Sequence, residues 1–533
     1  MNLVTEPWIP VVKPDGTHQL LSLLEVFTQG REFSDLAVRP HERIALMRLL
    51  ICIAQAALDG PTNKNWNAAS TNLPEAANQY LSQWLDSLNL FDQKKPFLQI
   101  STIEKLAKNA KANVDGELSD LTSVSKLDFA LATGNNTTLF DHGCLSNTSR
   151  DFTSASLALM LLTFQQFSPG GLIAKVQWEG KETSKSSFHA PCTPASMLHT
   201  FLRAETLFDT ICVNLLSKET IKRHFNNAIC DCWGKPIWEL MPTSLDDKIA
   251  VVNATQTYLG RLIPLSRLCW LQANGHSIMM GNGLTYKTYP DFSPETSATL
   301  IVNRNQERQI LGAGAKAIWR ELPAIIVSRK QNGEAGGALV LENIPDDKNL
   351  DIWLGALLTN KASILDTVES VFHIPANMRT DRGRNAYNDE VRWTEAISSK
   401  LSWAVETYRE QIDRGWEGRV KMAGAKKNQL RGQLHATATR HFWTAVEKFR
   451  PLLMAHIETI GTNAEAVTKS NKLWKSAVRK AAYESYRLAC GQETPRQMRA
   501  FALGWAKLVG KHKDQIIEQD ADTVNSENEE TEA

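Results

Sequence analysis

Residues 386–415 read AYNDEVRWTEAISSKLSWAVETYREQIDRG, and this stretch decides the architecture of the last third of the chain. Most of its apolar residues recur three or four positions apart, which is the spacing of one face of an amphipathic helix. That face comprises Val391, Ile397, Leu401, Ala404, Tyr408 and Ile412. Gly415 ends the pattern, because glycine commonly stops a helix. We therefore expect a helix over residues 386–414.

Three further amphipathic segments follow, over residues 428–460, 463–490 and from 495 onward. Asn463 stands where an N-cap belongs, and Thr494–Pro495 is an N-cap followed by proline at the first helical position. Four helices joined by short to moderate connections predict a four-helix bundle. Apolar stripes of this width bury a core and do not form a coiled-coil seam.

Charge is distributed unevenly along the 533 residues, although the net charge is only +1. Residues 379–513 contain 26 lysines and arginines against 13 aspartates and glutamates, a net charge of +13. Residues 514–533 contain 8 acids and no base, which leaves residues 1–378 with a net charge of −4. A basic unit inside a nearly neutral chain is typical of a protein that binds a polyanion. A solvated helical surface is the alternative interpretation.

The first part of the chain mixes short strands and helices. Residues 7–23 predict a hairpin around a Pro-Asp-Gly turn. Residues 40–58 and 154–166 predict apolar helices, and residues 248–345 alternate short β-like runs with Gly and Pro turns. The predicted fold class is therefore α+β.

The predicted organisation has three parts. Residues 1–378 form a large, irregular mixed domain, and residues 379–513 form the basic four-helix bundle. Residues 514–533 are acidic with few apolar side chains, so we expect a disordered tail.

The N-terminus shows no targeting segment. Residues 1–6 have neither the basic region nor the apolar core of a signal peptide. The most apolar helix candidate, residues 44–58, is short and contains Arg48, so we expect no membrane span and a cytoplasmic location. The eight cysteines are scattered, which fits reduced, buried thiols.

Familiar catalytic and metal-binding motifs are not found in the sequence. The run Gly312–Lys316 lacks the glycine and hydroxyl residue of a phosphate loop, and Gly275–His276–Ser277 lacks the second glycine of a nucleophile elbow. Cys230–Asp231–Cys232 does not have zinc-knuckle spacing. We expect a reader or scaffold with no cofactor and no metal. An enzyme whose site is assembled from distant residues, such as a nuclease or nucleotide-modifying protein, is the alternative.

Short motifs along nearly the whole chain resemble the CasA family, the large subunit of the type I-E CRISPR surveillance complex, Cascade. These motifs are Asn2–Leu3 with Glu6–Pro7–Trp8–Ile9–Pro10–Val11, Leu139–Phe140–Asp141–His142, Phe167–Ser168–Pro169–Gly170–Gly171, Trp319–Arg320–Glu321–Leu322–Pro323, Asn360–Lys361–Ala362–Ser363–Ile364 and Arg440–His441–Phe442–Trp443. Each motif is short, and their order and spacing carry the resemblance.

The resemblance implies a non-catalytic role in antiviral defence. CasA-like subunits sit in a crRNA-guided complex, where they read the protospacer-adjacent motif (PAM) in double-stranded DNA and promote duplex opening and R-loop formation. They also recruit the helicase-nuclease that degrades the target. The implied partners are the other Cascade subunits, crRNA, target DNA and that helicase-nuclease. A purely structural ribonucleoprotein scaffold is a further alternative.

The resemblance also implies DNA-binding residues in the first domain. Pro169, Gly170 and Gly171 resemble a glycine loop that lies against the PAM minor groove, where the missing Cβ permits a close approach; a helix-ending turn is the other interpretation. The segment 360–362, Asn360–Lys361–Ala362, resembles a wedge that unstacks the first target pair. Lys361 stands where the family pattern has glutamine, and an exposed turn lysine is its alternative.

Other residues are implied more loosely. Lys287 is similar to a lysine that reaches into the minor groove, or it is a solvated strand lysine. Phe140 and His142 lie in a loop that family members place near the guide RNA and a neighbouring subunit; Phe140 is equally well interpreted as a core residue. Basic residues of the bundle are expected to contact phosphates of the displaced strand. They are Lys421, Lys426, Lys427, Arg431, Lys472, Lys475, Arg479 and Lys480.

Overall fold

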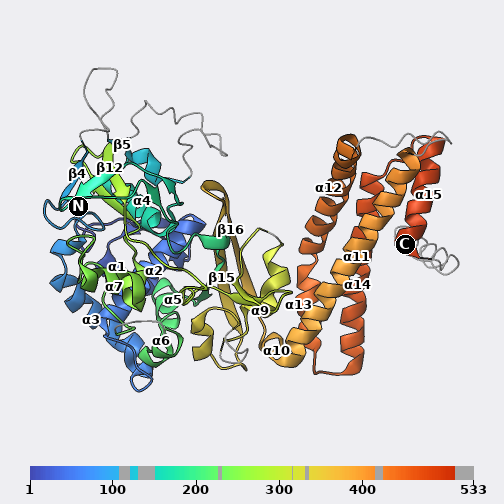
Figure 1. The fold of residues 1–533 in the computed structure, drawn as a ribbon. Helices are drawn as coiled ribbons and strands as arrows, with labels where there is room; N and C mark the ends of the chain where they lie inside the picture. The colour runs from blue at the N-terminus through green and yellow to red at the C-terminus, as the bar shows by residue number, and fades with distance from the viewer. Residues whose placement is uncertain are drawn as a thin grey trace. The chain divides into compact units, whose positions relative to one another are not determined.

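The chain divides into two compact units, Met1–Ile374 and Pro375–Ala533, whereas the sequence placed the change between residues 378 and 379 (Figure 1). The computed structural model describes residues 1–106, 121–129, 151–225, 231–314, 316–329, 335–413 and 424–510. Both helices and strands are present in the first unit, and the described elements of the second unit are helices, so the α+β fold class is confirmed.

The first unit opens with the predicted hairpin. Strand β1 (Ile9–Val12) pairs with β2 (His18–Leu21) and, on its other edge, with β3 (Asp35–Leu36). The turn between β1 and β2 is closed by Gly16, whose φ of +85° suits glycine. The helices that follow are α1 (Leu23–Gln29), α2 (Pro40–Ala57) and α3 (Ala69–Gln83).

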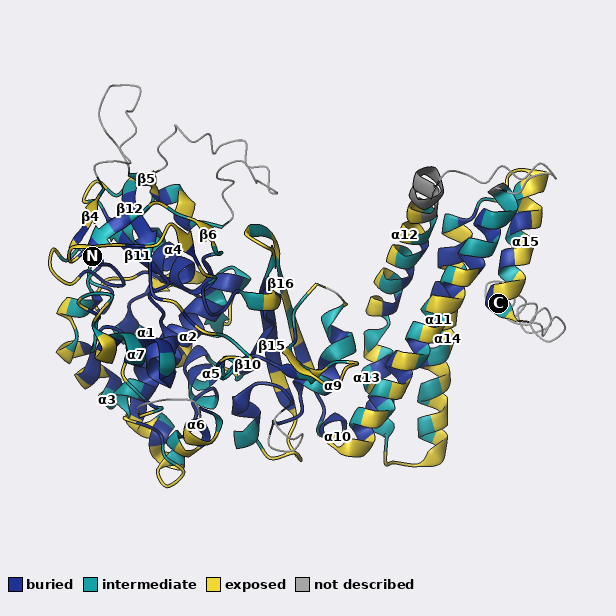
Figure 2. Ribbon diagram, viewed as in Figure 1, coloured by how far each residue is buried: buried dark blue, intermediate teal, exposed yellow. Residues whose placement is uncertain are grey.

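Two buried helices form the centre of this unit. Helix α2 packs against α4 (Ser154–Phe167), and both are buried on nearly every face (Figure 2). Thr153 caps α4, because its side chain accepts a hydrogen bond from the backbone N–H of Ser156. Both helices confirm the sequence prediction within a residue.

A three-stranded antiparallel sheet crosses the unit in the order β10-β15-β16. Strand β10 (His199–Arg203) pairs with β15 (Leu350–Asn360), and β15 pairs with β16 (Ser363–Ile374) in a long hairpin. The register shifts between Leu358 and Thr359, which is a bulge close to the hairpin tip.

Shorter elements complete the first unit. The strands are β4 (Ile103–Lys105), β5 (Thr122–Ser123), β6 (Gly171–Leu172), β7 (Val176–Trp178), β8 (Lys181–Glu182), β9 (Ser186–Ser187), β11 (Arg267–Leu271), β12 (Ser277–Asn282), β13 (Leu300–Val302) and β14 (Arg308–Ile310). The helices are α5 (Leu207–Val213), α6 (Lys218–His224), α7 (Lys248–Gln256), α8 (Tyr258–Leu262) and α9 (Leu322–Ile325).

The predicted succession of short strands from residue 248 is wrong at its start, where α7 and α8 lie. The reason is local capping. The Asp247 side chain accepts from the N–H of Ala250, and the Thr257 side chain accepts from the N–H of Gly260. Each capping bond satisfies a backbone donor that would otherwise be left without a partner at a helix start.

The second unit begins with α10 (Ala376–Arg379) and α11 (Asp381–Asp413). Helix α11 packs against α12 (Gly424–Lys448), α14 (Ala464–Ala489) and α15 (Pro495–Val509), and α12 also packs against α14. Helix α14 begins at the expected cap, since the Asn463 side chain accepts from the N–H of Ala466 at 2.7 Å.

One helix predicted for this unit is in fact two separate helices. The sequence predicted a continuous helix over residues 428–460, but α12 ends at Lys448 and α13 (Arg450–Thr459) follows. Pro451 lies in the first turn of α13. Proline has no N–H to donate and its ring clashes with the preceding turn, so the helix restarts there.

Candidate nucleic-acid interface

A two-stranded ribbon carries the glycine loop directly after α4. Strands β6 and β9 pair with Gly171 opposite Ser187. Two further hydrogen bonds keep the same register on either side: Ala190 N–H donates to Ser168 O, and Ile173 N–H donates to Lys185 O, both at 3.0 Å. We call residues 168–173 and 185–190 the glycine ribbon.

Glycine at position 170 is required by close backbone packing. A Cβ there would lie 3.0 Å from both His189 N and Ser187 O, which is tighter than ordinary contact. Gly170 N–H donates to His189 Nδ1 at 3.1 Å. Gly171 has a φ of +149°, a region that side chains rarely adopt. Both strands of the ribbon thus hold the loop in one shape.

Arg267, at the start of β11, donates hydrogen bonds to both strands of the ribbon. Its Nη2 donates to the carbonyl oxygens of Pro169 at 2.7 Å and Phe188 at 3.0 Å, and its Nη1 donates to Ser266 O at 2.6 Å. All three acceptors are neutral, so the guanidinium keeps its positive charge next to the loop.

The charge of Arg267 is buried. Burial lowers the pKa of Arg267 to about 10, which leaves it cationic at neutral pH. The nearby Lys126 has its pKa lowered by burial and by Arg267. Burial and the charge of Arg267 also lower the pKa of His189. A concentration of positive charge behind the ribbon attracts anions.

Gln165 holds Arg267 in place. Its Oε1 accepts from Arg267 N–H at 2.9 Å, and its Nε2 donates to Arg267 O at 2.8 Å. Gln165 lies in the last turn of α4, so the helix that leads into the loop also positions the arginine beneath it. The sequence reasoning missed Arg267 and Gln165, since a lone arginine in a β-like run gives no signal of its own.

The tip of the β15–β16 hairpin consists of Asn360, Lys361 and Ala362, and all three are exposed. Lys361 has a φ of +55°, the left-handed region that a turn of this kind needs. Ser196 ties the tip to the rest of the unit: its Oγ accepts from Thr359 N–H at 2.9 Å and lies 3.3 Å from Thr359 O.

The glycine ribbon and the hairpin tip meet. The Cβ direction of Gly171 points at the Cβ of Ala362, 3.9 Å from the position a Gly171 side chain would take. Figure 2 likewise shows β6 beside the tip of the hairpin. Two segments far apart in the sequence thus lie side by side. Lys287 lies exposed in the irregular segment after β12, and the contacts that join ribbon and tip do not include it.

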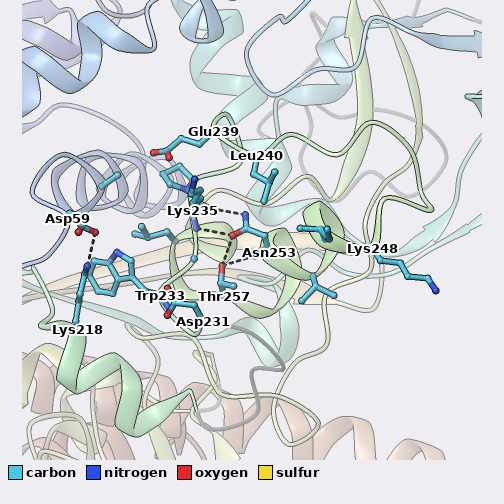
Figure 3. Close-up of a pocket in the computed structure, with 16 residues that line it drawn as sticks. Asp59, Lys218, Asp231, Trp233, Lys235, Glu239, Leu240, Lys248, Asn253 and Thr257 are labelled. Carbon is cyan, nitrogen blue, oxygen red and sulfur yellow. Dashed lines mark hydrogen bonds and ion pairs between the residues drawn. The ribbon is translucent and has the colours of Figure 1, made fainter.

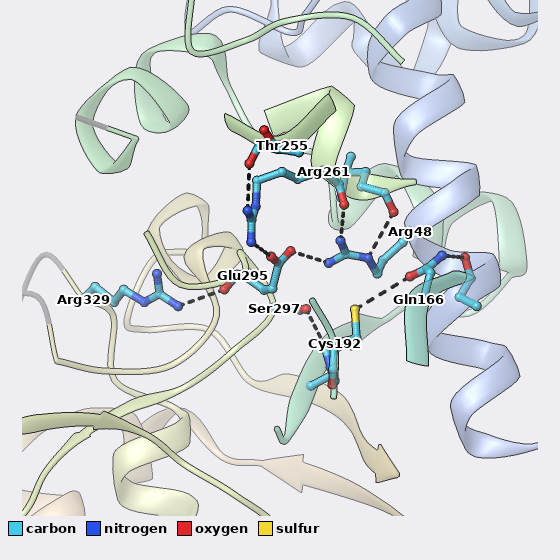
Figure 4. A network of polar contacts seen from close by, with 11 residues as sticks. Arg48, Gln166, Cys192, Thr255, Arg261, Glu295, Ser297 and Arg329 are labelled. Atoms are coloured by element: carbon cyan, nitrogen blue, oxygen red, sulfur yellow. Dashed lines mark hydrogen bonds and ion pairs between the residues drawn. The ribbon is translucent and has the colours of Figure 1, made fainter. Parts of the chain in front are cut away.

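A buried charge network lies in the same unit (Figure 4). Glu295 accepts from Arg48 of α2 at 2.8 Å and from Arg261 of α8 at 2.6 Å. Burial would raise the pKa of Glu295, but the charges of Arg261 and Arg48 outweigh it and hold that pKa below its usual value. Two residues on, Ser297 is bonded to His199 of β10, the strand that pairs with β15.

A cavity of about 700 Å³ lies elsewhere in the first unit (Figure 3). Its walls come from the end of α2, from α6 and α7, and from the loop around Trp233 and Lys235. Asn253 clamps this loop by bonding the N–H and the carbonyl of Lys235 at 2.8 and 2.9 Å. Lys218 at its edge pairs with Asp59. None of the residues that the sequence singled out for DNA contact lines it.

In the second unit, α14 presents four of the expected basic residues. Lys472, Arg479 and Lys480 are exposed. Lys475 is half-buried, pairs with Glu390 at 3.3 Å, and lies 5.3 Å from the Trp393 ring centroid, which Arg479 approaches to 5.5 Å from the same helix. Lys475 is thus partly neutralised, whereas the other three face solvent.

The remaining expected contacts are less defined. Phe140, His142 and Lys421 lie outside the described residues. Lys426 and Lys427 precede the helix predicted over residues 428–460, but α12 already begins at Gly424, because the residues that follow are mostly good helix formers. Arg431 lies in the same helix.

Within the described ranges, no group of three or more His, Cys, Asp or Glu side chains is placed to hold a metal ion. Over the same ranges, no helix combines the length and apolar character needed to cross a membrane.

Known proteins resemble the chain over almost its full length. A curated relative, CRISPR-associated protein CasA/Cse1 of Thermus thermophilus, is 25% identical over 97% of this chain and 98% of its own. The crystal structure of Thermus thermophilus CasA matches with a TM-score of 0.72 at 20% identity, covering 96% of this chain and 98% of the other. Thermobifida fusca Cse1 matches with a TM-score of 0.70 at 17% identity, covering 96% and 98%.

A chain in a structure described as a CRISPR RNA-guided surveillance complex matches with a TM-score of 0.70 at 17% identity, covering 96% of this chain and 99% of the other. The family model described as CRISPR-associated protein Cse1 matches residues 2–485. The chain therefore belongs to the CRISPR-associated Cse1 family.

Proposed function

We propose that the chain is the large subunit of a crRNA-guided surveillance complex of the Cascade type and recognises the PAM in double-stranded DNA without catalysing a reaction. Membership of the Cse1 family supports a place in such a complex. In RNA-guided systems base pairing reads most of the target, and the protein reads only the short PAM. The proposed partners are the other complex subunits, crRNA, target DNA and a helicase-nuclease.

The proximity of Gly171 to Ala362 carries this proposal. It brings two glycines without side chains, which can approach base pairs closely, next to an exposed hairpin tip that can act on the adjacent pair. The buried charge of Arg267 behind the loop favours a polyanion at this surface. A scaffold that never touched target DNA would need neither the loop nor the tip.

The tip is tested by Lys361→Asp in the reconstituted guide complex. Aspartate tolerates the left-handed backbone at this position, so the fold is kept while the charge is reversed. We expect R-loop formation on PAM-bearing duplex to slow by about tenfold, equivalent to ~1.4 kcal/mol, while assembly with the guide complex is unchanged. R-loop formation is measured by permanganate reactivity of the displaced strand.

Two controls accompany this variant. Lys361→Gln introduces the amide of the family pattern and should open the duplex at close to the original rate. Lys64→Asp reverses another exposed lysine of the same unit and should have no effect. An Lys361→Asp complex that opens DNA as fast as Lys64→Asp would refute the role of the tip.

The second unit is proposed to hold phosphates without reading sequence. Reversing Lys472 and Lys480 to glutamate should weaken DNA binding and reduce the slope of log K against log salt by about 2, since each phosphate contact contributes ~0.9. The control reverses Lys94 and Lys95, which are exposed in the first unit. Binding titrations at several salt concentrations give the slope, and equal slopes in both double variants would refute phosphate contact by α14.

A further inference from the structure

Two large apolar side chains of the glycine ribbon face solvent. Leu172 is 82% exposed and Phe188 is 63% exposed, although the backbone of each is fixed in the ribbon. Exposed apolar residues scattered singly are common and need no explanation. These two are not scattered, because the register of the ribbon brings them together.

That register puts both side chains on one side of the ribbon. Leu172 pairs with Ser186, and side chains two positions apart on a strand point the same way, so Phe188 shares the side of Leu172. Phe188 stands opposite Gly170, as the flanking bonds at 168–190 and 173–185 require. Diagonal neighbours of this kind are within reach of each other when one is aromatic.

The surroundings of the pair are cationic. The Phe188 carbonyl accepts from the buried Arg267 guanidinium, and Lys126 has its pKa lowered by burial and by that same arginine. An exposed aromatic side chain thus stands on backbone that is bonded to a buried positive charge. Proteins hold unpaired bases in this way, with rings that stack on bases and cations that attract the backbone.

We propose that Leu172 and Phe188 form a stacking surface for a base that is exposed when the duplex opens beside the glycine loop. The inference rests on the proposed function. It assigns to this apolar pair the stacking on a base that Lys361 cannot provide. A lysine at the hairpin tip can pair with phosphate but offers no flat surface to a base, whereas Phe188 does. Apolar side chains placed against base steps are a known means of keeping a duplex unstacked.

Packing of the aromatic ring over Gly170 does not account for these exposures. An aromatic side chain opposite a glycine can stabilise a ribbon by covering it. Such packing uses one face of the Phe188 ring, and it gives no reason for Leu172 to be 82% exposed beside it.

The test uses the reconstituted guide complex with a duplex that carries 2-aminopurine at the first position beyond the PAM. The fluorescence rise reports unstacking of that base. Phe188→Ala and Leu172→Ala should each reduce the rate of this rise, by about tenfold for Phe188, whereas Phe188→Trp should retain it. Ile249→Ala is the matched control, because Ile249 is 78% exposed in the same unit and lines the cavity of Figure 3.

The outcomes separate this inference from the proposed function. If the unmodified complex opens DNA in a PAM-dependent way and Phe188→Ala behaves as Ile249→Ala does, the stacking surface is refuted and the proposed function stands. If the unmodified complex shows no PAM dependence, both fail. If Phe188→Ala instead loses co-elution with the guide complex while its thermal unfolding is unchanged, the pair belongs to a protein interface and the inference is overturned.

Discussion

Glu295→Gln is expected to lower the free energy of unfolding of the first unit by about 3–5 kcal/mol. The substitution keeps the volume of the side chain but removes the negative charge that Arg48 and Arg261 share. Both arginines are buried, so neither can recover the lost interaction from water. Breaking one side of a buried ion pair leaves uncompensated charge, which is far more destabilising than losing a surface pair.

Urea unfolding followed by tryptophan fluorescence measures the change. The matched control is Glu182→Gln, because Glu182 pairs with Lys175 at 3.0 Å on the surface. Exposed pairs contribute only ~0–1 kcal/mol, so the control should shift the urea midpoint little. Equal midpoints for the two variants would show that the buried network does not stabilise the unit.

The same carboxylate has a pH signature. The folded-state pKa of Glu295 is below that of an unfolded glutamate, since the attraction of Arg261 and Arg48 outweighs the effect of burial. Its contribution to stability is therefore present above the unfolded pKa and is lost as the pH falls through the folded pKa. The unmodified chain should lose stability on acidification more than Glu295→Gln does.

Arg267→Ala is expected to weaken PAM-dependent DNA binding by about 30- to 100-fold, equivalent to ~2–3 kcal/mol. The variant removes the donors from the carbonyl oxygens of Pro169 and Phe188, so the two strands of the glycine ribbon lose their common anchor. It also removes the buried positive charge behind the loop. Both effects reduce affinity, and neither changes a residue that we place against DNA.

Arg267→Lys separates the two effects. A lysine keeps the charge but lacks the planar fork that bonds both strands, so its affinity should lie between those of the original chain and Arg267→Ala. Affinity is measured by filter binding of the reconstituted complex to duplexes with and without a PAM. A loss of equal size on both duplexes would show that Arg267 supplies general attraction and does not shape a reading surface.

Local sequence signals predicted individual helices and strands, but not the contacts between elements that are distant in sequence. Helix α4 and the Pro-Gly-Gly turn after it can be predicted from the sequence, because both depend on residues that are neighbours in the chain. The bonds from Arg267 to Pro169 and from Gln165 to Arg267 join residues that are distant in sequence, and no periodicity reports such pairs. Resemblance to a family, and not composition, pointed to residues 360–362.

The second unit shows the same division. Helical periodicity predicted the end of α11 to within one residue and placed its start five residues too late, because the amphipathic stripe marks the buried face and not the first turn. The same periodicity continues past Pro451, so it wrongly predicted α12 and α13 as one helix. Apolar spacing carries no information about the backbone N–H that proline lacks. Neither the ion pair between Lys475 and Glu390 nor the cation–π contact of Lys475 with Trp393 could be inferred from charge counts.

The meeting of the glycine ribbon with the hairpin tip has a consequence for the time at which the interface arises during synthesis. The ribbon leaves the ribosome long before the tip, because residues 168–190 precede residues 360–362 by much of the first unit. Strand β15 must then find β10, which also lies far upstream. Closing such long loops is slow, and no strand pairing compensates for the lost chain entropy until β15 and β16 have been synthesised. A nascent chain that ends before β16 therefore presents only half of the proposed DNA-reading surface, and that surface is complete only when the whole first unit has been made.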